Sequence, residues 1–225
     1  HTGVVDMNGG LWMWGLGSYG RLGLGEPIDV PLPRRIPIPE ELPVMQLALG
    51  SFHSVALVGT GRSQALYTWG YGEALGNKVG GGVSPTPLVV GLEEHSRAQV
   101  LQIAAGPYHT LVLMEDGELI SFGQGSSGRL GTGASKNHKL PVKLPGAHGF
   151  ATKLRNTDRS ADKAFQPRSP SNAQKRTLED PAERSMKRTA GTSAIGNGRQ
   201  GWEIAQLKCG DMFTAAVSWQ GALYT

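Results

Sequence analysis

Short apolar runs separated by glycine-containing turns occur through most of the chain. Val100–Ala104, Thr110–Met114 and Glu118–Phe122 are three such runs in close succession. Each has the length of a β-strand, and outside residues 153–200 no window of about 11 residues shows helical periodicity. Glu115-Asp116-Gly117 separates the last two runs and has the composition of a hairpin turn. The pattern therefore predicts short antiparallel strands.

The runs recur in a fixed order together with a glycine motif. Residues 10–23, 65–76 and 118–131 align, and in each an aromatic residue precedes Gly-x-Gly and a Leu-Gly pair follows. Gly15, Gly70 and Gly123 mark the spacing, at 55 and 53 residues. A repeat of roughly 20–50 residues or slightly more is typical of solenoids and propellers, because each unit buries its apolar face against the next.

A second motif, Gly-x-x-His-[Ser/Thr], precedes the second and third glycine motifs, and His1–Val5 resembles the tail of another copy before the first. The motif occurs at Gly50–Ser54 and Gly106–Thr110, and a weaker copy at residues 209–217 has Phe213 in place of the histidine. Residues 141–144 supply a proline-containing fourth run, which suits an edge strand. We expect four strands in each unit. The shared positions, which we expect to be structural, are Gly15, Gly17, Gly23, Gly50, His53, Trp69, Gly70, Gly72, Gly76, Gly106, His109, Gly123, Gly125, Gly131 and Gly210.

Residues 153–200 interrupt the repeats and differ in composition. They hold 11 of the 22 Lys and Arg residues but only five of the 18 acidic ones, so the rest of the chain is close to neutral despite the net charge of +4. Few large apolar residues occur there, and we predict a disordered insert. The predicted organisation is 1–152, repeats; 153–200, basic insert; and 201–225, the start of a further repeat. Within the insert a bipartite nuclear-localisation-like pattern is formed by Lys175, Arg176, Arg184, Lys187 and Arg188.

Some of these motifs have a possible functional interpretation, as a binding site, beside a structural interpretation. Gly15-x-Gly17-x-x-Gly20 matches the dinucleotide-binding fingerprint, but glycines and a proline follow where that fingerprint needs a helix. His53 and His109 fall one in each repeat, which favours buried histidines bonded to local backbone over metal ligands or a functional histidine on the ring face. We expect Trp14, Trp69 and Phe122 to pack between units.

Side-chain catalysis has no basis in the sequence. No phosphate-binding loop, Cys-x-x-Cys pair or nucleophile–base constellation is found, and the chain has one cysteine, Cys209. We predict a non-enzymatic binding module with no cofactor, metal or small-molecule substrate. No run of about 18 apolar residues occurs, so we expect no membrane span. The absence of disulfides favours an intracellular location, in the cytoplasm, the nucleus or both.

The order His-[Ser/Thr]-x-x-Leu, turn, aromatic-Gly-x-Gly, Leu-Gly resembles the repeat of the RCC1 (regulator of chromosome condensation) family over residues 1–150 and 201–225. The resemblance implies an all-β, RCC1-like β-propeller, here incomplete with three to four blades of four antiparallel strands. It implies a protein-interaction scaffold or regulatory module that binds a protein partner through its face loops. The alternative is guanine nucleotide exchange on a Ran-like small GTPase, and chromatin contact through the basic insert is a third hypothesis.

Overall fold

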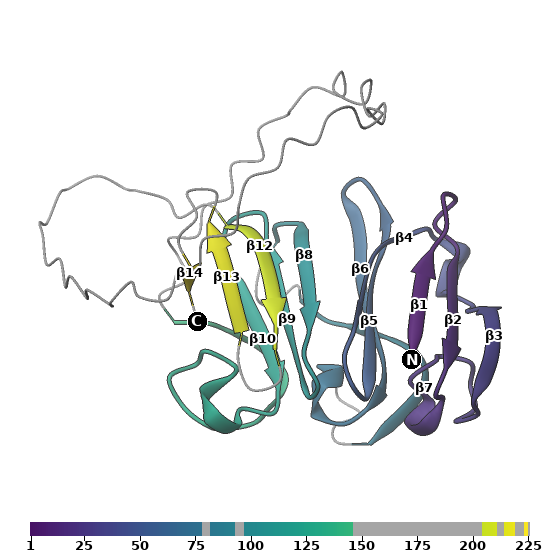
Figure 1. Ribbon diagram of the computed structural model, residues 1–225. Coiled ribbons are helices and arrows are strands. Elements are labelled where there is room, and N and C mark those ends of the chain that lie inside the picture. Colours follow the sequence, from purple (N-terminus) through teal and green to yellow (C-terminus); the bar gives the residue numbers. More distant parts are fainter. Residues whose placement is uncertain (78–81, 93–96, 146–203, 211–213, 219–222, 225) are drawn as a thin grey trace, which may run out of the picture. The chain divides into compact units, whose positions relative to one another are not determined.

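The computed structural model describes residues 1–77, 82–92, 97–145, 204–210, 214–218 and 223–224, and their strands form antiparallel sheets (Figure 1). Two of these sheets have four strands and two have three. The predicted insert, including the nuclear-localisation-like residues 175–188, lies outside the described residues.

Each sheet is formed by strands that are consecutive in the chain. The first sheet contains β1 (Thr2–Val5), β2 (Leu11–Gly15) and β3 (Val30–Arg35). The second contains β4 (Val44–Leu49), β5 (His53–Thr60), β6 (Ser63–Tyr71) and β7 (Val83–Val90). The third contains β8 (Val100–Ala105), β9 (His109–Met114), β10 (Leu119–Gly123) and β11 (His138–Lys143). The fourth contains β12 (Ile204–Cys209), β13 (Thr214–Ser218) and β14 (Leu223–Tyr224).

Four single turns of 3-10 helix connect strands in the described residues. They are η1 (Ser18–Gly20), η2 (Pro39–Glu41), η3 (Glu73–Leu75) and η4 (Ser126–Gly128). None of the helices in this part of the chain has the length and hydropathy needed to span a membrane.

The strand register shows that the sheets are copies of one unit. His53 pairs with Gly70 and His109 pairs with Gly123 across the two middle strands of their sheets. The inner strands β4, β8 and β12 each carry a register shift at the same point, next to a glutamine. The sequence repeat is therefore a structural repeat, and the four-stranded unit that it predicts is complete in the second and third sheets.

Cross-links from two glutamines join the inner strands of successive sheets. Gln46 on β4 donates to the Leu101 carbonyl at 2.7 Å and accepts the Ile103 N–H at 3.1 Å, both on β8. Gln102 accepts the Leu207 N–H of β12 at 3.0 Å. A side-chain amide that satisfies backbone groups of the next sheet fixes the spacing and register of the two sheets.

The core lies between sheets, because the second and third sheets bury most of both faces of their middle strands. All six residues of β9 and all five of β10 are buried. Trp69 packs with Leu11 and Met13 of the first sheet, and Phe122 packs with Val55 of the second. Fully burying an aromatic side chain of this kind contributes about 2–3 kcal/mol.

The edge strands β3, β7 and β11 contain proline, and β3 is the most exposed of them. In β3 five of six residues are exposed, and Leu32 retains 73% of its surface. Proline removes a backbone donor and so limits pairing of the edge with another chain.

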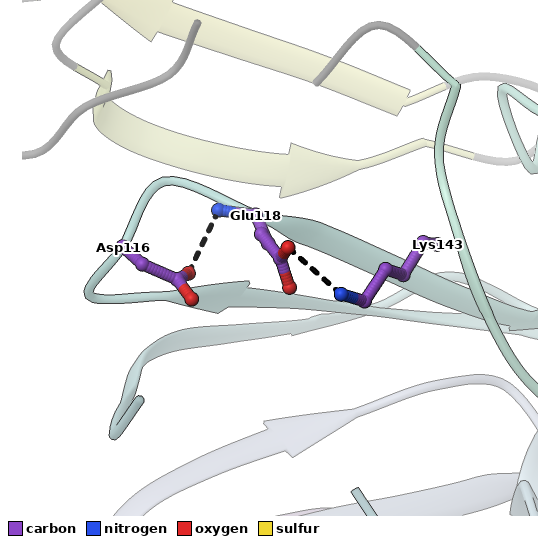
Figure 2. A network of polar contacts seen from close by, with 3 residues as sticks. All are labelled: Asp116, Glu118 and Lys143. Carbon is purple, nitrogen blue, oxygen red and sulfur yellow. Dashed lines mark hydrogen bonds and ion pairs between the residues drawn. The ribbon is translucent and has the colours of Figure 1, made fainter. Parts of the chain in front are cut away.

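The hairpin between β9 and β10 lies at the position predicted from Glu115-Asp116-Gly117. Figure 2 shows that the Asp116 carboxylate accepts the backbone N–H of Glu118 at 3.1 Å. Lys143 Nζ donates to Glu118 Oε1 at 2.8 Å, which ties the end of β11 to the start of β10. The second of these is a partly exposed ion pair and contributes about 1 kcal/mol or less.

Two packing expectations require correction. Trp14 has the same register as Trp69 and Phe122 but is only partly buried, because no described sheet covers that side of β2. His53 does not bond to local backbone: its Nε2 lies 2.9 Å from the Thr110 hydroxyl of the next sheet.

Candidate interaction surface

At one end of the second and third sheets, a backbone hydrogen bond joins two positions of the repeat. One is the residue between the glycines of Gly-x-Gly, and the other is the residue before the histidine. The Tyr71 N–H donates to the Phe52 carbonyl at 2.9 Å, and the Gln124 N–H donates to the Tyr108 carbonyl at 2.9 Å. The same backbone bond thus presents a pair of side chains in two successive sheets.

Three aromatic rings at these positions and a fourth from η1 form what we call the aromatic face: Phe52, Tyr71 and Tyr108, with Tyr19. Tyr19 lies 4.7 Å from Tyr71 and 5.9 Å from Phe52, between ring centroids. Phe52 stacks on Tyr108 at 5.0 Å with 25° between the ring planes. Tyr19 and Tyr71 keep 44% and 40% of their surface exposed, and the other two rings are partly buried.

The face is assembled from three sheets, so it depends on how the sheets pack. Tyr19 belongs to η1, between β2 and β3 of the first sheet, Phe52 and Tyr71 belong to the second sheet, and Tyr108 belongs to the third. In η1 Tyr19 has a φ of 63°, a left-handed conformation that turns the chain sharply. Its ring packs against Phe52 and Tyr71 of the next sheet.

Arg21 lies beneath the face and connects the first two sheets. The side chain is 5% exposed, its Nε donates to the Ser18 carbonyl at 2.8 Å, and its Nη1 donates to the Ser51 carbonyl at 2.7 Å. The guanidinium lies 5.1 Å from the Phe52 centroid and 5.7 Å from the Tyr19 centroid. Arg129, the same position in the third repeat, is also 5% exposed and donates to the Ser126 carbonyl at 2.9 Å.

A buried polar ladder supports the loops from below. The Thr110 hydroxyl donates its proton to the Ala74 carbonyl at 3.1 Å, so His53 Nε2–H must be the donor to that hydroxyl. In the preceding pair, His1 Nε2 lies 3.0 Å from the Ser54 hydroxyl. His1 and His53 therefore each bond to the residue that follows the histidine of the next sheet.

These histidines are neutral. Burial, and secondarily the neighbouring His109, lower the pKa of His53 to about 3. Burial, and secondarily Arg129, lower the pKa of His109 to about 4. Both rings are 0% exposed, so they cannot reach a partner directly.

The motif glycines leave room for these contacts. A Cβ on Gly50 would lie 2.5 Å from the His53 ring, and one on Gly106 would lie 2.2 Å from the His109 ring. Gly76 adopts a φ of 64° against Phe122. The other motif glycines also lie in turns, at strand ends or in the loops around η1, η3 and η4: Gly15, Gly17, Gly23, Gly70, Gly72, Gly123, Gly125, Gly131 and Gly210.

The loop chemistry does not fit a dinucleotide. Only a three-residue 3-10 turn follows Gly17, and the Gly17 N–H already donates to Asp29 Oδ1 at 2.9 Å. The fingerprint needs the N-terminus of a helix at this place. Among the described residues no group of three His, Cys, Asp or Glu side chains is placed to hold a metal ion.

Sequence reasoning identified the scaffold but not the aromatic face. The signal was present, because Phe52 and Tyr108 both stand immediately before the repeat histidine. An aromatic residue that recurs next to a core position, on the opposite side of the strand end, indicates a surface preference. Tyr19 and Tyr71 gave no such signal, since neither residue type recurs at its position.

Antiparallel sheets repeated in one register, joined through their inner strands and carrying variable loops at one end, define a repeat β-propeller module. The family model described as "Regulator of chromosome condensation (RCC1) repeat" matches residues 8–57 and 116–154, and a second model of that repeat matches 100–129. The chain therefore carries RCC1-like repeats that form an incomplete propeller, and it is a β-propeller interaction or regulatory module.

Known proteins that resemble the chain are longer than the part they share with it. The mitochondrial RCC1 domain-containing protein RUG3 of Arabidopsis thaliana is 37% identical over 139 residues, which are 60% of this chain and 30% of that protein. Human WBSCR16 has a crystal structure that matches with a TM-score of 0.56 and 28% identity, over 63% of this chain and 36% of that one. Yeast RCC1 (Prp20), solved bound to Kap60, matches with a TM-score of 0.52 and 21% identity, over 63% and 34%. The chain spans about a third of each.

Proposed function

We propose that the chain is a protein-docking scaffold whose contact surface is the aromatic face. The observation that supports the proposal is the cluster of four rings, two of them 40% or more exposed, on loops tied down by backbone bonds. Tyrosine and other aromatic residues are enriched at the centres of protein interfaces, because they bury a large area with little loss of rotamer freedom. Loops on a rigid β scaffold are the usual place for such contacts.

The polar side chains of Arg21 and His53 are buried, and both bond to groups of the neighbouring sheet, so they belong to the scaffold that holds the aromatic face. A surface of this kind would bind a protein partner with affinity and specificity and would carry out no reaction on it.

The test is capture of binding proteins by two surface variants of the full chain. A triple variant, Tyr19→Ser, Phe52→Ser and Tyr71→Ser, removes most of the aromatic face. The control, Leu32→Ser with Val89→Ser, removes apolar surface from the outer strands, where these residues are 73% and 56% exposed and so more accessible than the rings. We expect the first to lose the partner bound by the wild type and the second to retain it. Equal recovery by the triple variant would disprove the docking role.

The finer hypotheses from the sequence stay predictions. Nucleotide exchange on a Ran-like GTPase is tested by fluorescent-nucleotide release, and no acceleration by the full-length protein would exclude it. Nuclear import through residues 175–188 is tested by localisation after deletion of 153–200. The same deletion should abolish salt-dependent DNA binding if the insert contacts chromatin.

A further inference from the structure

Among the described residues, the Arg21 guanidinium beneath the aromatic face has no carboxylate within 4.0 Å. The ion pairs in the described residues, Lys139 with Glu73 and Lys143 with Glu118, do not involve Arg21. Both acceptors of the Arg21 guanidinium are neutral carbonyls. Within the described chain Nη2 donates no hydrogen bond, so this arginine has donor capacity left over.

Asp29 compensates this charge only at a distance. One of its oxygens accepts the Gly17 N–H, and no carboxylate of the described residues lies within 4.0 Å of Arg21. Burial lowers the pKa of Arg21, while Tyr19 and Asp29 oppose that shift. Arginine nevertheless keeps its charge in proteins, so a buried cation remains under the rings.

The Arg21 guanidinium lies directly under two rings of the aromatic face, so its positive charge acts on groups that approach these rings. The guanidinium occupies the neighbourhood of Phe52 and Tyr19, at 5.1 and 5.7 Å from their centroids, and is attracted to their electron-rich faces. A cation from a partner would compete with Arg21 for the same rings and would be repelled by the Arg21 charge. An anion at this point would be attracted instead, at short range and in poorly solvated surroundings.

The third repeat offers an internal comparison. Arg129 is as buried as Arg21, but Ser127 and Gln124 stand where the first two repeats place Tyr19 and Tyr71. The buried arginine thus recurs as part of the scaffold, whereas the rings above it are confined to the junction of the first, second and third sheets.

If the aromatic face docks a protein, as proposed above, its buried cation selects the kind of partner. We propose that the face binds an acidic peptide segment, in which an Asp or Glu carboxylate approaches Arg21 Nη2 and flanking apolar side chains pack on Tyr71 and Tyr108. The carboxylate completes the arginine's hydrogen bonds, and a charge-assisted bond of this type is about twice as strong as a neutral one.

The first test uses a displayed library of random 12-residue peptides selected on the full chain at low salt. We expect the recovered peptides to be enriched in Asp and Glu next to apolar residues and depleted of Lys and Arg. Recovery of no binder, or of binders without acidic enrichment, overturns the proposal.

The second test is a double-mutant cycle with one selected peptide, measured by fluorescence anisotropy. The protein variant is Arg21→Met, and the peptide variant replaces its acidic residue by the matching amide. We expect each change to weaken binding at least tenfold, and the two together to weaken it no more than either alone, since both remove one interaction. Arg129→Met is the control and should leave binding within about twofold of the wild type.

The outcomes separate this proposal from the docking role itself. If the triple variant Tyr19→Ser, Phe52→Ser and Tyr71→Ser loses the peptide but Arg21→Met and the amide peptide both bind like the wild type, the docking role stands and the acidic partner is refuted. If the triple variant binds the peptide normally, the docking role and the acidic partner are both refuted. Should Arg21→Met unfold in a thermal melt, the amide peptide on wild-type protein decides, and binding equal to that of the acid form overturns the proposal.

Discussion

Acid should destabilise the fold through its two buried histidines well before its carboxylates titrate. His53 and His109 have folded-state pKa values of about 3 and about 4, against an ordinary value of 6.5. Between these limits the unfolded chain binds more protons than the folded one. The stability is therefore complete above pH 6.5 and is lost as the pH falls below it.

The size of the loss follows from the depth of the shift. Each histidine contributes about 1.4 kcal/mol per pH unit once the unfolded form is protonated and the folded form is not. From pH 6.5 to pH 5 this amounts to about 2 kcal/mol per histidine and about 4 kcal/mol for the pair. The pKa of Asp6 is lowered from 3.8 by its bond to Trp12 and by backbone bonds, so this carboxylate titrates below the window.

The assay is urea denaturation at pH 7, 6 and 5, followed by tryptophan fluorescence. His53→Gln should lower the free energy of unfolding at pH 7 by about 1–3 kcal/mol, because it disturbs the bond to Thr110. It should also remove about half of the dependence on pH. His138→Gln, on the partly exposed edge strand, is the control and should leave the dependence as it is in the wild type. A flat wild-type profile between pH 7 and 5, or equal slopes for wild type and His53→Gln, would refute the reasoning.

Three further changes test the packing between sheets by the same urea assay. Gly76→Ala places a Cβ 2.5 Å from the Phe122 ring at a φ of 64° and should cost about 2–4 kcal/mol, whereas Gly61→Ala, at a φ of 53° with no neighbour within 4 Å, should cost only about 1 kcal/mol. Equal losses would contradict the close contact. Gln46→Leu removes both bonds from β4 to β8 and leaves two backbone groups unpaired, so a loss of about 2–4 kcal/mol is expected; a loss under about 0.5 kcal/mol would show that the cross-link is dispensable. Trp69→Phe keeps a ring but removes the indole bond to a loop carbonyl at 2.9 Å, for about 1–3 kcal/mol, and an unchanged midpoint would argue against that bond.

The repeat and its strands could be predicted because their signals are local. The strands predicted at Val100–Ala104 and Thr110–Met114 correspond to β8 and β9, and their predicted ends differ from the observed ends by at most one residue. The turn at Gly117 connects the strands expected on each side. Turn glycines and short apolar runs act within a few residues, so a single sequence contains them.

Contacts between sheets could not be read in the same way. The bond from His53 to Thr110 spans 57 residues and the bond from Trp69 to the Arg21 carbonyl spans 48. A histidine followed by a hydroxyl residue looks like a local pair, and only the stacking of two sheets brings the second hydroxyl within reach. The partial exposure of Trp14 had the same origin, because burial depends on the neighbouring sheet and not on the motif.

The division between buried and variable positions explains how one repeat can present different surfaces. The histidine, the hydroxyl after it and the loop carbonyl that receives the hydroxyl proton form the same ladder in successive sheets. Because that ladder fixes the loop backbone, the residue within Gly-x-Gly can change from Leu16 to Tyr71 to Gln124 without a change of scaffold. Binding specificity then depends on side chains at these surface positions, and a cluster of rings arises only where neighbouring repeats place aromatic residues on both sides of one junction.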